Sequence, residues 1–220
     1  MRLLSVATLQ SSVRVAGDLA KTNAVCSAAL DNATTRVAAE MRDTFDRKTG
    51  VSEMFHVNPR DGINMGSQSV PIWRGRFALK SGFLSATPVI TYANSIPTLD
   101  TAPETVPADY LSTNLLKGDV HVMGLDLRTK FIRVTYTSGF VVDADDAQLY
   151  TVPAAYTWLV EAAKSFAVAE LIRVAPDLMS PDSADGEGAA RPTPNAAEKN
   201  ARAILAPYIR YFPDAIRAVA

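Results

Sequence analysis

The sequence has one cysteine, two histidines and almost no net charge. Because Cys26 is its only thiol, an internal disulfide and a cysteine-based metal site are both excluded. His56 and His121 lie in separate predicted strands, where each is better explained as a strand-face residue than as a metal ligand. The net charge of −1 provides no general attraction to nucleic acid or to an anionic membrane, so any basic function must be local.

Long hydrophobic runs are also absent. No stretch reaches the ~18 consecutive apolar residues of a membrane-spanning helix, and no membrane contact is predicted. Residues 1–12 are only weakly similar to a signal peptide, because Ser5, Thr8 and Gln10 interrupt the apolar stretch. The chain of 220 residues is 48% hydrophobic and 20% charged, a balance typical of ordered domains with a buried core.

Apolar residues recur at helical spacing in the N-terminal part of the chain. Residues 12–47 are predicted to form one long helix with Cys26 on its apolar face, as a buried structural thiol. Gly50 follows the charged last turn, where a glycine commonly ends a helix.

Two further helices are predicted in the C-terminal part. Residues 151–175 form a mostly apolar helix whose first position suits Pro153. A Pro- and Gly-rich linker, residues 176–194, precedes a last helix at about residues 196–212. Asn195 and Glu198 resemble a capping box at its start, and Pro207 should bend it or end it early.

The middle of the chain has the pattern of strands. Short runs rich in β-branched and aromatic residues, separated by turn residues, predict an antiparallel region of about four to six strands. Residues 95–109 are expected to form an extended surface loop. Ile132, Val134 and Tyr136 should face the core of one strand, and Gly139 should turn the chain out of the sheet.

Together these elements predict an α+β fold. A small α-helical core combines a long N-terminal helix, a buried central helix and a C-terminal helix, with an antiparallel β region inserted. Residues 1–50 and 151–220 are assigned to the helical core with its C-terminal docking tail, and residues 51–150 to the inserted β region.

Residue patterns of known active sites are missing from the sequence. There is no Ser-His-Asp order, nucleophile elbow or phosphate-binding loop. Asp143, Asp145 and Asp146 lack the glycine and distal glutamate of a calcium loop, and a solvated turn explains them better. No enzymatic activity, metal or cofactor is predicted.

Basic residues gather in two predicted strands and their surroundings. They are candidates for phosphate contact without base readout, or for contacts between subunits, although a solvated face is the simpler explanation. These residues are Arg74, Arg76, Lys80, Arg128, Lys130 and Arg133.

The order of motifs resembles the head–tail connector (adaptor) proteins of tailed bacteriophages. In that family a strand ending in V-x-Y-T-x-G-[FY] leads to a proline-capped, alanine-rich helix. Here "FIRVTYTSGF" is followed by "YTVPAAYTWLVEAAKSFAVAEL", and "ILAPYIRYF" is similar to the family's C-terminal helix. Val134, Tyr136, Thr137, Gly139, Phe140 and Pro153 occupy the matching positions. The resemblance covers roughly residues 25–48, 83–174 and 196–212.

The resemblance implies a structural role in the phage neck. Such proteins form a ring of roughly twelve copies, in which each subunit has two different contact faces. The ring lies between the portal protein and the tail or a stopper protein, and packaged DNA passes through it with transient, non-specific contacts. A virion protein of this kind is made in the bacterial host cytoplasm.

The resemblance also assigns the C-terminal tail to portal docking. The tail residues concerned are Tyr208, Ile209, Arg210, Tyr211, Phe212 and Ile216. Alternatives are another neck component, such as a stopper or tail-completion protein, an enzyme acting on nucleic acid or cell wall, and a DNA-binding module.

Overall fold

The structure is a computed structural model, which describes residues 1–13, 19–57, 73–125, 131–176, 193–211 and 216–217. The chain divides into two compact units. The helical unit comprises Met1–Arg42 and Val141–Ile209, and the β unit comprises Asp43–Phe140 and Arg210–Ala220. Helices and antiparallel strands together confirm the predicted α+β class. These unit boundaries differ from the expected ones at residues 43–50, 141–150 and 210–220.

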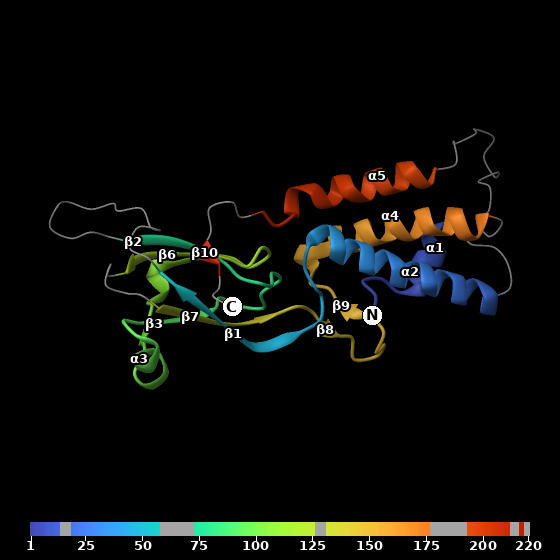
Figure 1. The fold of residues 1–220 in the computed structure, drawn as a ribbon. Helices are drawn as coiled ribbons and strands as arrows, with labels where there is room; N and C mark the ends of the chain where they lie inside the picture. Colours follow the sequence, from blue (N-terminus) through green and yellow to red (C-terminus); the bar gives the residue numbers. More distant parts are fainter. Residues whose placement is uncertain (14–18, 58–72, 126–130, 177–192, 212–215, 218–220) are drawn as a thin grey trace. The chain divides into compact units, whose positions relative to one another are not determined.

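Three helices form the body of the helical unit and lie side by side (Figure 1). They are α2 (Leu19–Met41), α4 (Thr157–Val174) and α5 (Pro194–Leu205). The shorter elements are α1 (Val6–Val13), β8 (Val141–Val142), β9 (Tyr150–Thr151), η2 (Ala154–Tyr156) and η4 (Ala206–Tyr208). Within the described residues, no helix has the length and apolar character needed to span a membrane.

Small side chains line the contacts of these helices. Alanines let helix axes approach closely, and Phe166 of α4 is a buried aromatic residue among them. Cys26 is fully buried on α2, as predicted. The buried residues of the three helices include Ala29, Leu30, Ala33, Val37, Met41, Leu159, Ala162, Ala163, Ala167, Leu171, Ala201 and Leu205.

The first long helix ends earlier than the sequence predicts. α2 stops at Met41, and Arg42 adopts a left-handed conformation with φ of 55°. The reason is Phe45, which is buried with its ring 5.4 Å from that of Phe83 and 5.7 Å from that of Phe140. Gly50 therefore does not end a helix but lies within a strand.

The caps of the other helices also differ from the predicted ones. Thr193 caps α5, since its hydroxyl accepts a hydrogen bond from the Ala196 amide, and the helix begins at Pro194. Glu198 is not part of a capping box and forms ion pairs instead. Pro153 precedes the 3₁₀ turn η2 rather than opening α4. The prediction for Pro207 is confirmed, because α5 ends at Leu205 and a single 3₁₀ turn follows.

The β unit contains two four-stranded sheets, whose orders are β1-β7-β3-β4 and β10-β2-β6-β5. Every pair is antiparallel except β10–β2. The strands are β1 (Lys48–His56), β2 (Trp73–Ala78), β3 (Val89–Ala93), β4 (Glu104–Thr105), β5 (Leu111–Asn114), β6 (Asp119–Leu125), β7 (Phe131–Ser138) and β10 (Ile216–Arg217).

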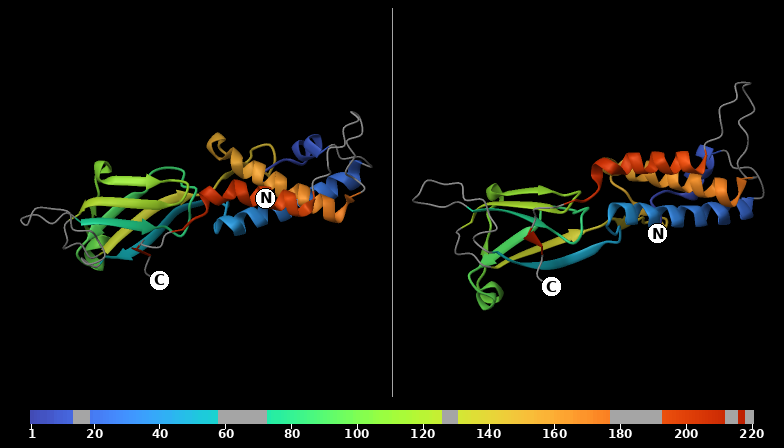
Figure 2. Two further views of the ribbon diagram at one scale, coloured as in Figure 1. Left: turned by 90° about the horizontal axis from the view of Figure 1, so that it is seen from above. Right: turned by 45° about the horizontal axis from the view of Figure 1, so that its top comes forward.

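The two sheets share one core. Strand β7 alternates as predicted, with Ile132, Val134 and Tyr136 buried. Phe55 of β1 and Phe77 of β2 are both fully buried, with ring centroids 5.0 Å apart. Buried side chains of both sheets form a single hydrophobic cluster, and Figure 2 shows the sheets facing each other.

The segment expected to be an extended surface loop is structured instead. Residues 96–101 form helix α3 (Ile96–Thr101), capped by the Ser95 hydroxyl, and β4 and the 3₁₀ turn η1 (Ala108–Tyr110) follow. Leu99 and Val106 are buried and attach this segment to the β unit. Isolated apolar residues among prolines and acids do not show a period, which is why the sequence pattern missed the helix.

Candidate functional site

The C-terminal part of the chain begins with an aromatic stack in the helical unit. The Tyr208 ring of η4 stacks on the Trp158 ring of α4, with centroids 3.9 Å apart and an interplanar angle of 14°. Tyr208 and Ile209 are half-buried. The resemblance places both in the docking tail, and the structure gives Tyr208 an intramolecular partner.

Arg210 binds a site in the β unit formed by the Asp43 carboxylate and the carbonyls of Leu79, Lys80 and Lys117, which we call the Arg210 site. Its Nε donates to the Lys117 carbonyl at 2.9 Å, and Nη1 donates to the Lys80 carbonyl and Asp43 Oδ2, each at 2.9 Å. Nη2 donates to the Leu79 carbonyl. The side chains of Arg210 and Asp43 are only 8% and 2% exposed.

Two glycines allow the backbone to converge on this site. A Cβ at Gly82 would lie 2.3 Å from the Leu116 carbonyl oxygen, and one at Gly118 would lie 2.3 Å from the Ser81 oxygen. Without these side chains, the segment after β2 runs against the β5–β6 turn, and the Leu79 amide donates to the Gly118 carbonyl at 2.9 Å. The arrangement turns backbone carbonyls toward one guanidinium, whose fork of donors matches several acceptors.

The sequence pattern does not predict the Arg210 site. It indicates Arg210 only as a tail residue, because the partners of Arg210 are far away in sequence and three of them are backbone carbonyls. Gly82 and Gly118 were the signals available, but a glycine in a turn does not reveal which segment approaches it.

The remaining tail residues differ in their surroundings. Tyr211 is 73% exposed. Ile216 lies in β10, where it pairs in parallel with Phe77 of β2. Phe212 lies outside the described residues.

The basic residues of the β unit do not form a free cationic surface in the part that the structure describes. Arg76 makes a bidentate pair with Asp119, with both distances 2.8 Å, and Arg133 pairs with Asp100. Lys80 is exposed. Arg128, Lys130 and the side chain of Arg74 lie outside the described part. A role of these residues toward DNA or neighbouring subunits stays a prediction.

A network of ion pairs joins the three helices of the helical unit. Glu198 of α5 accepts from Arg36 of α2 at 2.8 Å and from Arg173 of α4 at 2.5 Å. Arg202 lies 3.7 Å from Glu198 and pairs with Glu40 at 2.9 Å. The hydrogen bond from Arg36 is the main reason that the pKa of Glu198 falls to about 2. A carboxylate held this way is a structural anion and a poor proton acceptor at neutral pH.

The residues considered for metal binding or catalysis are dispersed. His56 lies on β1 with its ring 5.1 Å from that of Phe131, and Nε2 of His121 on β6 lies 3.3 Å from Asp119 Oδ2. Burial raises the pKa of the Cys26 thiol. Among the described residues, no group of three or more His, Cys, Asp or Glu side chains could hold a metal ion.

In the acidic turn between β8 and β9, the carboxylate of Asp143 forms hydrogen bonds with backbone amides. Asp143 accepts hydrogen bonds from the amides of Asp145 and Asp146, at 2.9 and 3.2 Å. This geometry is that of a local turn, as the sequence favoured.

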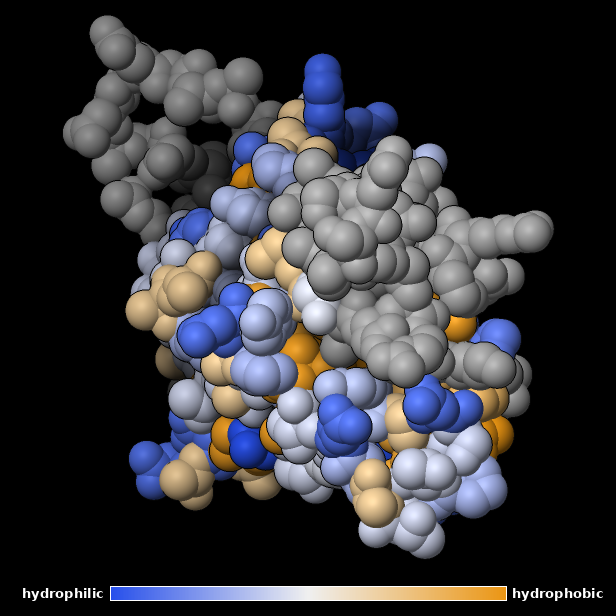
Figure 3. Space-filling model, turned by 90° about the vertical axis from the view of Figure 1, so that its left-hand side faces the viewer, coloured by the Kyte–Doolittle hydropathy of each residue, from blue (hydrophilic) through white to orange (hydrophobic). Residues whose placement is uncertain are grey.

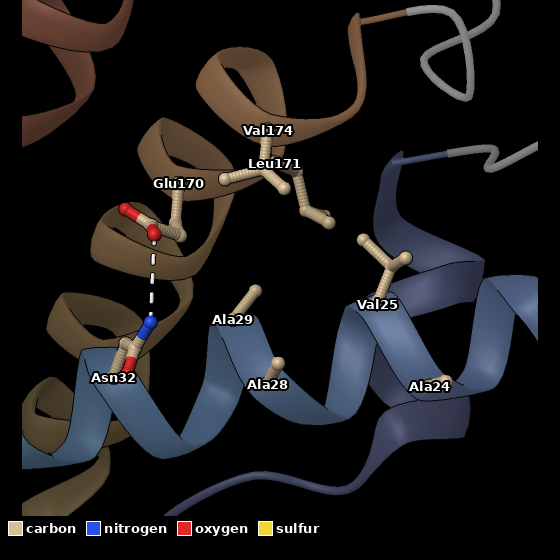
Figure 4. Close-up of a pocket in the computed structure, with 8 residues that line it drawn as sticks. All are labelled: Ala24, Val25, Ala28, Ala29, Asn32, Glu170, Leu171 and Val174. Atoms are coloured by element: carbon tan, nitrogen blue, oxygen red, sulfur yellow. Dashed lines mark hydrogen bonds between the residues drawn. The ribbon is translucent and has the colours of Figure 1, made fainter.

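A shallow groove of about 320 Å³ lies between α2 and α4 (Figure 4). Its floor is small and apolar, and the Asn32 amide donates to Glu170 Oε1 at 3.4 Å at one end. Val174, at the other end, is 65% exposed. The lining residues are Ala24, Val25, Ala28, Ala29, Asn32, Glu170, Leu171 and Val174.

Exposed large apolar residues of the β unit are scattered. Val89, Ile96 and Tyr110 are 58%, 42% and 47% exposed. On the face seen in Figure 3, hydrophobic areas are small and separated by hydrophilic residues. Single exposed apolar residues of this kind are normal on a protein surface.

The chain was compared with known protein families, curated proteins and solved structures. No family model matches the sequence. No curated protein matches it either. A solved chain from a structure described as "Neck of empty GTA particle computed with C6 symmetry" is similar to this chain, with 14% identity and a TM-score of 0.42. The alignment covers 96% of this chain and 92% of the solved chain.

Proposed function

We propose that this protein is a non-enzymatic structural component of the neck of a tailed phage. In this proposal it forms an adaptor ring of roughly twelve copies that joins the portal protein to the tail or a stopper protein around the DNA channel. It resides in the virion after synthesis in the host cytoplasm, and its contacts with packaged DNA are transient and non-specific.

The observation that carries the proposal is the continuity of one segment. Strand β7 ends at Ser138, Gly139 turns with φ of 80°, and the chain passes through β8 and β9 to Pro153 and the buried helix α4. The same order of strand, glycine, proline and alanine-rich helix is the basis of the sequence resemblance to the adaptor family.

The exposed ring of Tyr211 is the best-placed described residue for docking in the proposed tail. Tyr208 and Arg210 already have partners within the chain, so deleting residues 208–220 would remove internal contacts together with any docking contact. Substituting Tyr211 alone avoids this ambiguity, because its side chain is 73% exposed.

The test mixes the purified protein with the portal protein of the same phage and images the product by electron microscopy. We expect rings on the portal for the wild type. Y211A should weaken the association about tenfold in a titration, the effect of losing one aromatic contact. Y110A, which removes an exposed tyrosine of the β unit, is the matched control. Failure of the wild type to bind the portal would overturn the proposal.

A further inference from the structure

The C-terminal segment, residues 210–217, is attached to one short stretch of its own chain at two points. The carbonyls of Leu79 and Lys80 accept from Arg210. The two preceding residues, Phe77 and Ala78, pair with Ile216 and Arg217 of β10. Residues 77–80 therefore hold both the beginning and the end of the segment.

The first attachment point has the character of a built binding site. It offers four acceptors, one of them the carboxylate of Asp43, which is 2% exposed. The same carboxylate accepts from the Gly82 amide at 2.5 Å and the Thr44 amide at 2.8 Å, so its position is determined before Arg210 binds. Such a preorganised site costs little further ordering on binding.

The two attachment points differ in strength. β10 consists of two residues in a parallel pair, which provides few hydrogen bonds. Arg210 makes charge-assisted hydrogen bonds in a buried position, which are the stronger kind. Of the two attachment points, Arg210 is therefore the stronger one.

We infer that Asp43, Lys117 and residues 77–80 form a binding site for the C-terminal segment, and that the unassembled chain fills this site with its own segment. The second half of the inference rests on the proposed function: if the tail docks on a partner through Arg210 or β10 as well as through the exposed Tyr211, the partner must compete with this intramolecular attachment. The attachment then weakens docking, because the segment can bind the partner only in the fraction of molecules in which it has left the intramolecular site.

Hydrogen exchange of the full-length protein tests the attachment without any partner. R210A should raise the exchange rate of the Ile216 amide, which faces β2, at least about tenfold, because both ends of the segment are released together. R202A, which removes an exposed arginine of α5, is the matched control and should leave this rate unchanged. R210K keeps the charge but lacks the guanidinium fork, and we expect an intermediate rate.

R210A leaves the Asp43 carboxylate buried without its cation, which can destabilise the β unit as a whole. The double variant R210A/D43N removes that charge and should restore the cooperative thermal transition without restoring slow exchange at Ile216. Restored protection in the double variant would overturn the inference.

Limited trypsin digestion of the wild type provides an independent measurement. Cleavage after Arg210 requires its side chain to enter the protease, so it should occur no faster than release of the segment measured by exchange. Rapid cleavage there, or equal exchange at Ile216 in wild type and R210A, would overturn the inference. Neither assay involves the portal, so their failure is distinguishable from failure of the proposed function.

Discussion

Two glycines of the β unit share a left-handed backbone conformation but differ in their surroundings. Gly139 has φ of 80°, and an added Cβ would lie 2.3 Å from the Asp46 carbonyl oxygen and 2.8 Å from that of Phe45. Gly50 has φ of 62° with no atom within 4 Å of such a Cβ. Only at Gly139 does close backbone approach add to the conformational cost.

This difference predicts unequal effects of the same substitution. G50A should lower the free energy of unfolding by about 1 kcal/mol, the cost of a left-handed alanine. G139A should cost at least about 3 kcal/mol, because the backbone of residues 45 and 46 must also move. Urea unfolding of both variants measures the two values, and equal values would contradict this account of the turn.

The lowered pKa of Glu198 predicts how the free energy of unfolding depends on pH. Folding lowers its pKa from 4.5 to about 2, so the folded state favours the ionised form. Its contribution to the free energy of unfolding is complete above pH 4.5 and is lost as the pH falls toward 2.

E198Q should therefore unfold more easily at neutral pH, by on the order of 2 kcal/mol. Its stability should also vary less than that of the wild type between pH 4.5 and 2. E161Q changes an exposed glutamate of α4 and serves as the control. Thermal unfolding at a series of pH values measures the effect, and parallel curves for wild type and E198Q would argue against the ion-pair network.

At the scale of elements, the end of α5 shows how one proline prepares a tertiary contact. Pro207 stops the helix after Leu205, and the following 3₁₀ turn presents Tyr208 to Trp158 of α4. The stack joins the C-terminal helix to the central one at a point where regular helix has ended.

A double-mutant cycle of W158A and Y208A measures how much this contact contributes to the free energy of unfolding. We expect a coupling energy of about 0.5–1.5 kcal/mol, the range for stacked aromatic pairs. Y156A, paired with W158A, provides a comparison with an edge-on contact at 6.4 Å. A coupling near zero for W158A and Y208A would mean that the stack contributes no stability beyond its buried area.

At the scale of the whole molecule, each unit has buried residues of its own. Phe166 is 1% exposed in the helical unit, and Phe77 is fully buried in the β unit. Each core joins segments far apart in sequence, since the helical unit combines residues before 43 with residues after 140.

F166A and F77A should each lower stability by about 3–5 kcal/mol, the usual cost of removing a buried phenyl ring. Hydrogen exchange should rise first within the unit that carries the substitution, because local cores set local opening free energies. Equal increases in both units for either variant would show that the two units open as one.

Periodic features of this protein can be predicted from its amino-acid sequence. The alternation of β7, the burial of Cys26, the end of α5 at Pro207 and the turn at Gly139 all depend on neighbouring residues. Local sterics and hydrophobic periodicity are sufficient for such features. The α+β class followed from their order.

The positions of single, non-periodic residues depend on tertiary contacts that the sequence pattern does not reveal. Phe45 packs against Phe83 and Phe140, and α2 ends before it. Glu198 forms ion pairs with Arg36 and Arg173 instead of the predicted capping box. Arg210 finds acceptors more than ninety residues away. These contacts depend on which distant segments meet, and burial decides their strength, because a charge removed from water must be paired.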